Sequence, residues 1–198
     1  MKISGKISAA IVMAGALLTG PAFAHSFNVA LVIALSGEQE EAGRQFLDGF
    51  MLATTERDAH ANQESDGHLG GLDVYVSLLD ANVSGQDMVL EFAGQNDIDI
   101  VIGPWGSGAL SLSQSALAEQ GVSLLSPGVA PPLDGEGRAI AAFRENFART
   151  YGTVPGTDAT QGYNAAQRIE IAVRGQGGVA DAEALAQSFA ETVGGFDW

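Results

Sequence analysis

Hydrophobic and polar positions along the chain follow two different periods. Residues 27–35 (FNVALVIAL) form a nearly continuous apolar run, which is typical of a strand buried on both faces of a parallel sheet. Residues 38–58 then carry apolar side chains at helical spacing, with acids in the first turn, where the helix dipole favours negative charge. The pattern therefore predicts a strand followed by a helix.

The same alternation continues to about residue 125. The sequence predicts three further strands, over residues 72–78, 98–102 and 122–125, and two further helices, over residues 86–96 and 107–120. Regular alternation of strand and helix favours a parallel sheet with helices packed on its faces. We therefore expect an α/β fold with three layers (αβα) and a mainly parallel sheet.

Loops at one edge of this sheet are the expected place for a ligand. Ligands of open parallel sheets bind beyond the carboxyl ends of the strands. In this chain those ends are the loops that begin at Ser36, Asp80, Gly103 and Ser126.

The pattern changes after residue 125. Residues 126–137 hold three prolines and three glycines, which indicates a turn-rich connector. Apolar positions at helical spacing then predict three consecutive helices, over residues 139–151, 158–174 and 180–192.

The first 24 residues have the order of a cleavable secretion signal. Lys2 and Lys6 precede an apolar stretch over residues 7–18, and Ala22-Phe23-Ala24 supplies small residues for the peptidase. The apolar stretch is too short for a membrane span, which needs about 20 apolar residues. We expect cleavage after Ala24, export to the periplasm, and one domain over residues 25–198.

The charge of the chain narrows the classes of partner. Nine basic residues stand against 24 acids, which gives a formal net charge of −15, and both lysines lie in the expected signal. An acidic surface repels nucleic acid and anionic membrane, so no nucleic-acid partner is expected. The absence of cysteine excludes a cysteine nucleophile and thiolate metal sites.

Four segments, which cover most of residues 27–178, occur in the order of a known family. They are VALVIALSGEQEEAGRQFLDGFMLA, DIDIVIGPWGS, GVSLLSPGVAPP and YGTVPGTDATQGYNAAQRIEIAVRGQGG. In this order the chain resembles the type I periplasmic solute-binding proteins of ABC importers, which have the leucine/isoleucine/valine-binding fold. The resemblance implies a protein that binds branched-chain amino acids or a related small polar or carboxylated solute and delivers it to an importer permease.

The resemblance also implies where the solute binds. The segment after Ile-Gly-Pro would offer Ser107 and nearby backbone N–H groups to the carboxylate or polar head, at a predicted helix N-terminus that favours an anion. The second contact would follow Ser126-Pro127, where Ala130 replaces the usual hydroxyl side chain and one donor is lost. Trp105 would either stack on the ligand or cap the edge of the core. The candidate ligand-binding residues are Ser36, Trp105, Gly106, Ser107, Ser126, Gly128 and Ala130.

The length of the chain departs from the family. Family members have two lobes that close on the ligand, and the second lobe would be inserted between Pro132 and Ala139. We expect a single lobe, with βα units over residues 25–130, a linker over residues 131–138 in place of the second lobe, and returning helices over residues 139–198. A partner chain that supplies or replaces the missing lobe stays an alternative, as does a degenerate docking or sensory module without a transport role.

Enzymatic and metal-binding functions have weaker support in the sequence. The only histidines are His25, His60 and His68, and none has the spacing of a nucleophile–base pair. The Gly-rich nucleotide-binding motifs are also absent, so neither catalysis nor a cofactor is expected. Cleavage after Ala24 would expose His25, whose amine and imidazole could hold copper together with His60 or His68. That spacing is not diagnostic, and no metal site is expected.

Overall fold

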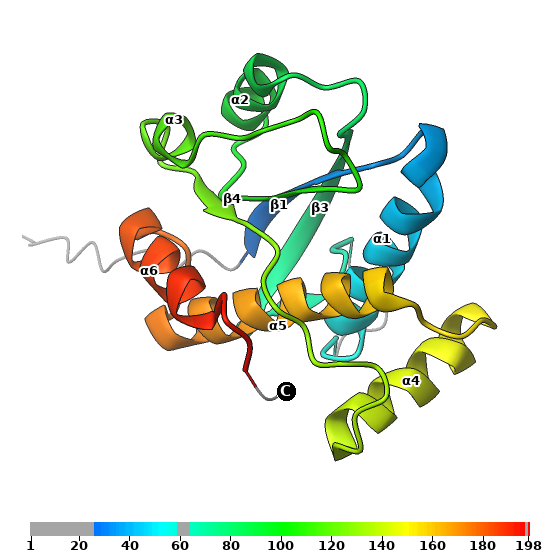
Figure 1. Cartoon of the computed structure of the whole chain (residues 1–198). Coiled ribbons are helices and arrows are strands. Elements are labelled where there is room, and N and C mark those ends of the chain that lie inside the picture. Colours follow the sequence, from blue (N-terminus) through cyan, green and yellow to red (C-terminus); the bar gives the residue numbers. More distant parts are fainter. Residues whose placement is uncertain (1–25, 59–63, 197) are drawn as a thin grey trace, which may run out of the picture.

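The computed structural model describes residues 26–58, 64–196 and 198, and a five-stranded sheet lies at its centre (Figure 1). The order of strands across the sheet is β2-β3-β1-β4-β5; the β2–β3 pair is antiparallel and the other pairs are parallel. The strands are β1 (Ser26–Ile33), β2 (His68–Leu69), β3 (Leu72–Asp80), β4 (Ile100–Trp105) and β5 (Ser123–Leu125). The expected signal with its cleavage site, and His25 and His60, lie outside the described residues.

Helices cover both faces of the sheet, which confirms the expected α/β fold with three layers. The helices α1, α5 and α6 pack on one face, and α2 and α3 pack on the other (Figure 1). A 3₁₀ turn, Gly37–Gln39, leads into the first helix. The bounds are α1 (Glu40–Thr55), α2 (Gln86–Gln95), α3 (Gln114–Ala118), α4 (Arg138–Tyr151), α5 (Thr157–Gln176) and α6 (Ala182–Thr192).

The continuous apolar run at the start of the sequence is explained by β1, the middle strand of the sheet. Val29, Leu31 and Ile33 point into the core under α1 and α5. Ala30 and Val32 point into the core under α2 and α3. Because both faces of β1 are covered, neither set of alternate positions can be polar.

Two glycines allow α1 and α5 to pack backbone against backbone. A Cβ atom added at Gly49 would lie 1.9 Å from the carbonyl oxygen of Ala159, and one added at Gly162 would lie 1.8 Å from that of Phe46. Any larger residue at either position would push the helices apart. The close packing holds α5 across the face of the sheet.

The predicted helix over residues 107–120 is wrong in its first half. Helix α3 begins at Gln114, where the Oγ of Ser113 accepts a hydrogen bond from the backbone N–H of Ala116. The preceding residues have no regular structure: Gly106 has φ of +74°, and Leu110 and Leu112 pack against the core under α2 and α3. Two leucines at alternate positions reach one core from an extended chain, whereas in a helix they would face different directions.

Two smaller differences concern the sheet. The strand β4 continues through Gly103 and Pro104 to Trp105, instead of ending at the Gly-Pro pair. The short strand β2 lies between the predicted helix over residues 38–58 and the predicted strand over residues 72–78, and the pattern does not predict it because two residues are too few to produce a visible period.

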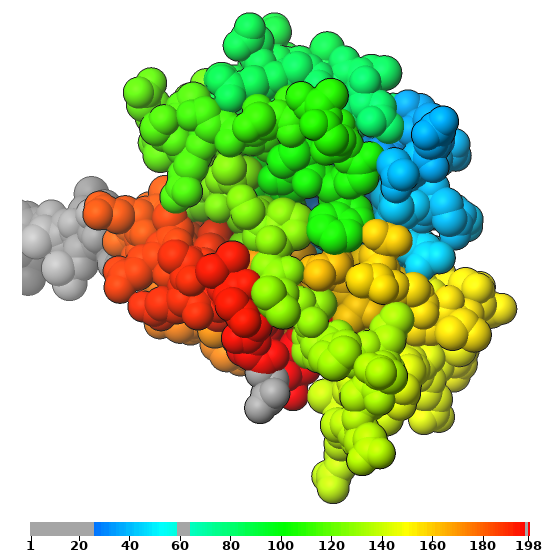
Figure 2. Space-filling model, viewed as in Figure 1, coloured from blue at the N-terminus to red at the C-terminus, as the bar shows by residue number. Residues whose placement is uncertain are grey.

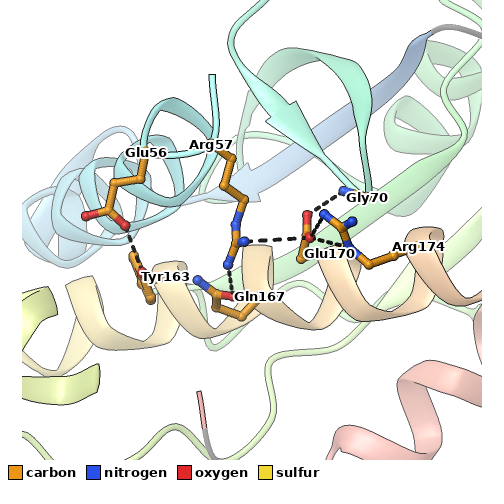
Figure 3. Close-up of polar contacts among 7 residues, drawn as sticks. All are labelled: Glu56, Arg57, Gly70, Tyr163, Gln167, Glu170 and Arg174. Atoms are coloured by element: carbon orange, nitrogen blue, oxygen red, sulfur yellow. Dashed lines mark hydrogen bonds and ion pairs between the residues drawn. The ribbon is translucent and has the colours of Figure 1, made fainter. Parts of the chain in front are cut away.

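Polar side chains on α5 attach it to α1 and to the β2–β3 turn (Figure 3). Glu170 accepts a hydrogen bond from the backbone N–H of Gly70 at 2.5 Å and pairs with Arg57 and Arg174, at 3.6 Å and 2.5 Å. The hydroxyl of Tyr163 donates to Glu56, with 2.8 Å between the oxygens. These contacts lie on the side of α5 that faces α1. The opposite side of α5 contacts the residues at the ends of β4 and β5.

None of the helices in the described part of the chain combines the length and the apolar composition that a membrane span requires.

Candidate functional site

The carboxyl edge of the sheet contains a topological switch point. From β1 the chain passes to β3 on one side, and later returns to β4 on the other side of β1. Ligands of open α/β sheets bind where the order reverses in this way. The loops after β1 and β4 meet here, because a Cβ atom added at Gly106 would lie 2.9 Å from the Cβ of Ala34 and 3.4 Å from that of Gln39.

Ser36 orders the loop after β1 through Asp80, the last residue of β3. Its hydroxyl donates to Oδ2 of Asp80 at 2.5 Å, and the backbone N–H of Leu35 donates to Oδ1 at 3.0 Å. The hydrogen bond from Ser36 is the main cause that lowers the pKa of the Asp80 carboxyl below its usual value. The proton of the Ser36 hydroxyl is therefore engaged, and only its lone pairs face other groups.

Trp105 joins the end of β4 to the start of α5. Its indole Nε1–H donates to Oδ1 of Asp158 at 3.0 Å, and its ring lies 5.4 Å from the ring of Phe46, centroid to centroid. The ring thus packs at the edge of the core while part of it stays on the surface. Of the two roles expected for Trp105, the structure provides the contacts of a core cap.

Ser107 carries a buried polar atom that finds no hydrogen-bond partner within the described residues. Its Oγ is one of a small set of such atoms, and Oε1 of Gln161 is another. Gln161 follows Asp158 by three positions on α5, so both residues lie on one face of that helix. Because Ser107 precedes the first residue of α3 by seven positions, the helix N-terminus expected at Ser107 is absent.

The second group of candidates lies at the end of β5, against α5 and α6. The carbonyl oxygen of Ser126 accepts a hydrogen bond from Nη1 of Arg168 at 2.7 Å. Gly128 lies between Arg168 and Val193, where an added Cβ atom would be 2.9 Å from Nη1 and 2.8 Å from the carbonyl oxygen. Ala130 lines a hollow of about 360 Å³ that is otherwise formed by Val129, Pro131, Pro132, Gly195 and Phe196.

The two groups of candidates contact different parts of α5. Trp105 meets Asp158 in the first turn of the helix, whereas Ser126 meets Arg168 ten residues later. Ten residues of α-helix span about 15 Å. The structure therefore brings together Ser36, Trp105, Gly106 and Ser107 at the switch point, and places Ser126, Gly128 and Ala130 further along α5.

The sequence pattern does not identify several residues that contact these loops. Asp158, Gln161 and Arg168 read as ordinary polar positions of an amphipathic helix. The partner of Asp158 is Trp105 at the end of β4, and one partner of Arg168 is Ser126 just after β5, each more than 40 residues away in the chain. Asp80 was recognised only as the start of a loop. No local signal in the sequence points to the roles of these residues.

No cluster of three metal-ligating side chains is present in the described part of the chain. His68 lies between two carboxylates, with Nδ1 3.3 Å from Asp58 and Nε2 2.8 Å from Asp73. These contacts attach the β2–β3 hairpin to the end of α1 and lie away from the switch point.

Comparisons with proteins of known structure identify the fold. No protein-family model matches the sequence, and a search of curated proteins finds no match. A solute-binding protein of an ABC transporter from R. palustris, in complex with benzoate, is similar with a TM-score of 0.62 and 14% identity, over 83% of this chain and 85% of that chain. The fold is that of type I periplasmic solute-binding proteins.

Two further structures with this solute-binding fold come from other bacteria. The branched-chain amino acid transporter substrate-binding protein of Streptococcus pneumoniae, in complex with isoleucine, has a TM-score of 0.62 and 12% identity, over 84% of this chain and 88% of that chain. A leucine-binding protein from Thermotoga maritima has a TM-score of 0.52 and 11% identity, over 84% of this chain and 87% of that chain. At such low identity the likeness concerns the fold alone.

Proposed function

We propose that this protein is a periplasmic solute-binding protein that delivers a small polar or carboxylated solute to the permease of an ABC importer. The solute binds at the carboxyl edge of the sheet, and the protein carries out no chemistry on it. The single observation that supports this most is the buried, unpartnered Oγ of Ser107 beside the switch point of a parallel sheet. A buried hydroxyl without a partner is costly to leave unsatisfied, and a bound ligand would satisfy it.

The fold supports a small organic acid as the class of solute. Two of the similar structures are complexes with isoleucine and with benzoate, and both molecules carry a carboxylate. The proposal assigns the polar contacts of the solute to Ser36, Gly106 and Ser107 at the switch point. Ser126, Gly128 and Ala130 form the second group of candidates, further along α5. Trp105 then supplies the apolar wall.

A single lobe has consequences for affinity. Two-lobed binding proteins bury their ligand by closing a hinge, whereas one lobe leaves the ligand open to water on one side. We therefore expect weak binding by the chain alone, and tighter binding where a partner chain covers the open side. Export to the periplasm with removal of residues 1–24 is part of the same proposal.

Isothermal titration calorimetry on the full chain tests this function. The panel consists of isoleucine, leucine, valine, benzoate and propionate, and the expected result is saturable heat with at least one of them. Ser107→Ala should weaken that binding about tenfold, since one hydrogen bond to a ligand is worth about 1.4 kcal/mol. Ser111→Ala is the matched control, because Ser111 is an exposed serine of the same loop. No heat with any member of the panel would contradict the proposal and favour a docking or sensory module.

A further inference from the structure

Arg168 is the largest fully buried side chain in the described part of the chain, and only 1% of its surface is exposed. The side chain of Arg168 projects from the side of α5 that faces α6 and the end of β5. Its Nη1 donates to the carbonyl oxygen of Ser126 at 2.7 Å and its Nη2 to that of Phe189 at 2.6 Å. Its Nε donates to Oγ1 of Thr192 at 3.0 Å. Three of the five N–H groups of the guanidinium are thus engaged.

All three of these acceptors are neutral. Among the residues that the structure describes, no carboxylate forms an ion pair with Arg168. The contrast with Glu170, two residues further along α5, is sharp, because that buried acid pairs with both Arg57 and Arg174 (Figure 3). A buried charge without an opposite charge is unfavourable. Burial lowers the pKa of Arg168 to about 10, so the side chain stays protonated at neutral pH.

A hollow of about 230 Å³ lies beside this buried cation. Arg168 lines it together with two other polar side chains, Gln114 and Ser126, with Ala186 and Ala190 of α6, and with Val193 just after that helix. On the face seen in Figure 2, the connector after β5 and helix α6 lie side by side. The lining residues place the hollow where these two segments meet Gln114, the first residue of α3. The hollow therefore opens at the carboxyl end of β5.

The chemistry of the lining selects an anion. The guanidinium is planar, has unused donors, and suits the two oxygens of a carboxylate. Gln114 and the Ser126 hydroxyl can donate further hydrogen bonds, and no acidic side chain lines the hollow. In a chain with a formal net charge of −15, a wall with one cation and no acid is a distinct feature.

We propose that this hollow, named here the Arg168 hollow, binds the carboxylate of the solute, with Arg168, Ser126 and Gln114 as its polar contacts. The inference rests on the proposed function, because the hollow belongs to the same carboxyl edge of the sheet. From the sequence, the carboxylate is expected at Ser107, where the structure has no helix N-terminus. This inference places the carboxylate at the end of β5 instead. The carboxylate supplies the opposite charge that Arg168 lacks.

Calorimetry with propionate and propionamide on the full chain tests this inference. The two probes have nearly the same shape and differ in charge, and both are titrated at the same ionic strength. We expect saturable heat with propionate and at least tenfold weaker binding of propionamide. Ala190→Leu fills the hollow without changing Arg168, and it should weaken propionate binding at least tenfold. Ala148→Leu, which adds the same side chain at an exposed position of α4, should leave the binding unchanged.

The outcomes separate this inference from the proposed function. If isoleucine or benzoate binds but Ala190→Leu has no effect and propionamide binds as well as propionate, the Arg168 hollow is not the carboxylate site while the proposed function stands. If no solute of the panel binds, propionate included, both proposals are contradicted. Thermal unfolding of Ala190→Leu without ligand, compared with that of Ala148→Leu, shows whether the variant is folded.

Discussion

The indole Nε1 of Trp105 lies 3.0 Å from Oδ1 of Asp158, so the last residue of β4 is fixed to the first turn of α5. This contact determines where the loop that contains Ser107 leaves the sheet. It joins that loop to α5, on which Arg168 and Gln161 also lie.

Removal of the carboxylate should loosen Trp105. In a Trp198→Phe background, where Trp105 is the only tryptophan, Asp158→Ala should shift the fluorescence emission to longer wavelength. It should also lower the free energy of unfolding by about 1–2 kcal/mol, the worth of a hydrogen bond to a charged group that is partly exposed. Asp158→Asn keeps an acceptor oxygen and should show a smaller shift. Identical spectra for all three proteins would mean that this hydrogen bond does not hold the indole.

The backbone contact of α1 with α5 makes a prediction about Gly162. Gly162→Ala should destabilise the protein by at least about 3 kcal/mol, because overpacking here acts on backbone atoms that have no room to move. Gly175, in the last turns of the same helix, has nothing within 4 Å of its added Cβ position. Gly175→Ala should therefore stabilise the protein by about 0.5–1 kcal/mol, the difference in helix propensity. Urea unfolding measures both, and equal effects of the two substitutions would argue against the close packing.

The buried Glu170 on α5 should contribute more to the stability of the protein than the exposed Glu41. Glu170→Ala removes the carboxylate that pairs with Arg57 and Arg174 and leaves the backbone N–H of Gly70 without its acceptor. Because the side chains of Arg57 and Arg174 are 36% and 64% exposed, water can solvate both charges, and the expected cost is about 1–3 kcal/mol, that of the lost charged hydrogen bonds and the unsatisfied N–H. Glu41→Ala removes an exposed ion pair with Arg44 and should change the stability by less than about 1 kcal/mol. Chemical denaturation of the two variants should give this order, and the reverse order would be inconsistent with the contacts in Figure 3.

Asp99 makes stability depend on pH. Burial raises the pKa of its carboxyl above the usual value, with a further contribution from Asp97, although the backbone N–H of Asn28 donates to Oδ2 at 2.8 Å. Because the folded state holds this proton more tightly than the unfolded state, the ionised carboxylate opposes folding at neutral pH. The opposition disappears as the pH falls below the ordinary pKa of an aspartate.

Asp99→Asn should therefore raise the melting temperature at pH 7 and have little effect near pH 3. The asparagine side chain keeps an oxygen that accepts the Asn28 hydrogen bond. Thermal unfolding of both proteins across this pH range is the measurement. A stabilisation that is the same at both pH values would exclude ionisation of Asp99 as its cause.

The hydrophobic pattern along the chain is enough to predict the parallel strands of the sheet and most of the helices. The apolar run over residues 27–35 is unambiguous because β1 is covered on both faces, and α5 carries a long amphipathic pattern. The start of α3 could not be predicted, because Leu110 and Leu112 pack on the core from an irregular loop that has the same composition as a helix. That difference also removes the helix N-terminus that was expected to favour an anion at Ser107.

Contacts at the candidate site were harder to predict than the elements that carry it. The hydrogen bonds of Ser36 with Asp80 and of Ser126 with Arg168 join residues that are more than 40 positions apart. Local periodicity carries no information on such pairs. An arginine on the buried side of α5 shows its role only when the neutral partners at the ends of β5 and α6 are known.

Backbone NMR on the isotope-labelled full chain, titrated with isoleucine and with benzoate, tests the central claim most directly. Binding at the carboxyl edge predicts saturable shifts in the amide signals of residues 34–37, 105–108, 126 and 128–130, with little change at the β2–β3 hairpin on the opposite side. Shifts confined to other parts of the chain, or none with either solute, would contradict a solute site at this edge.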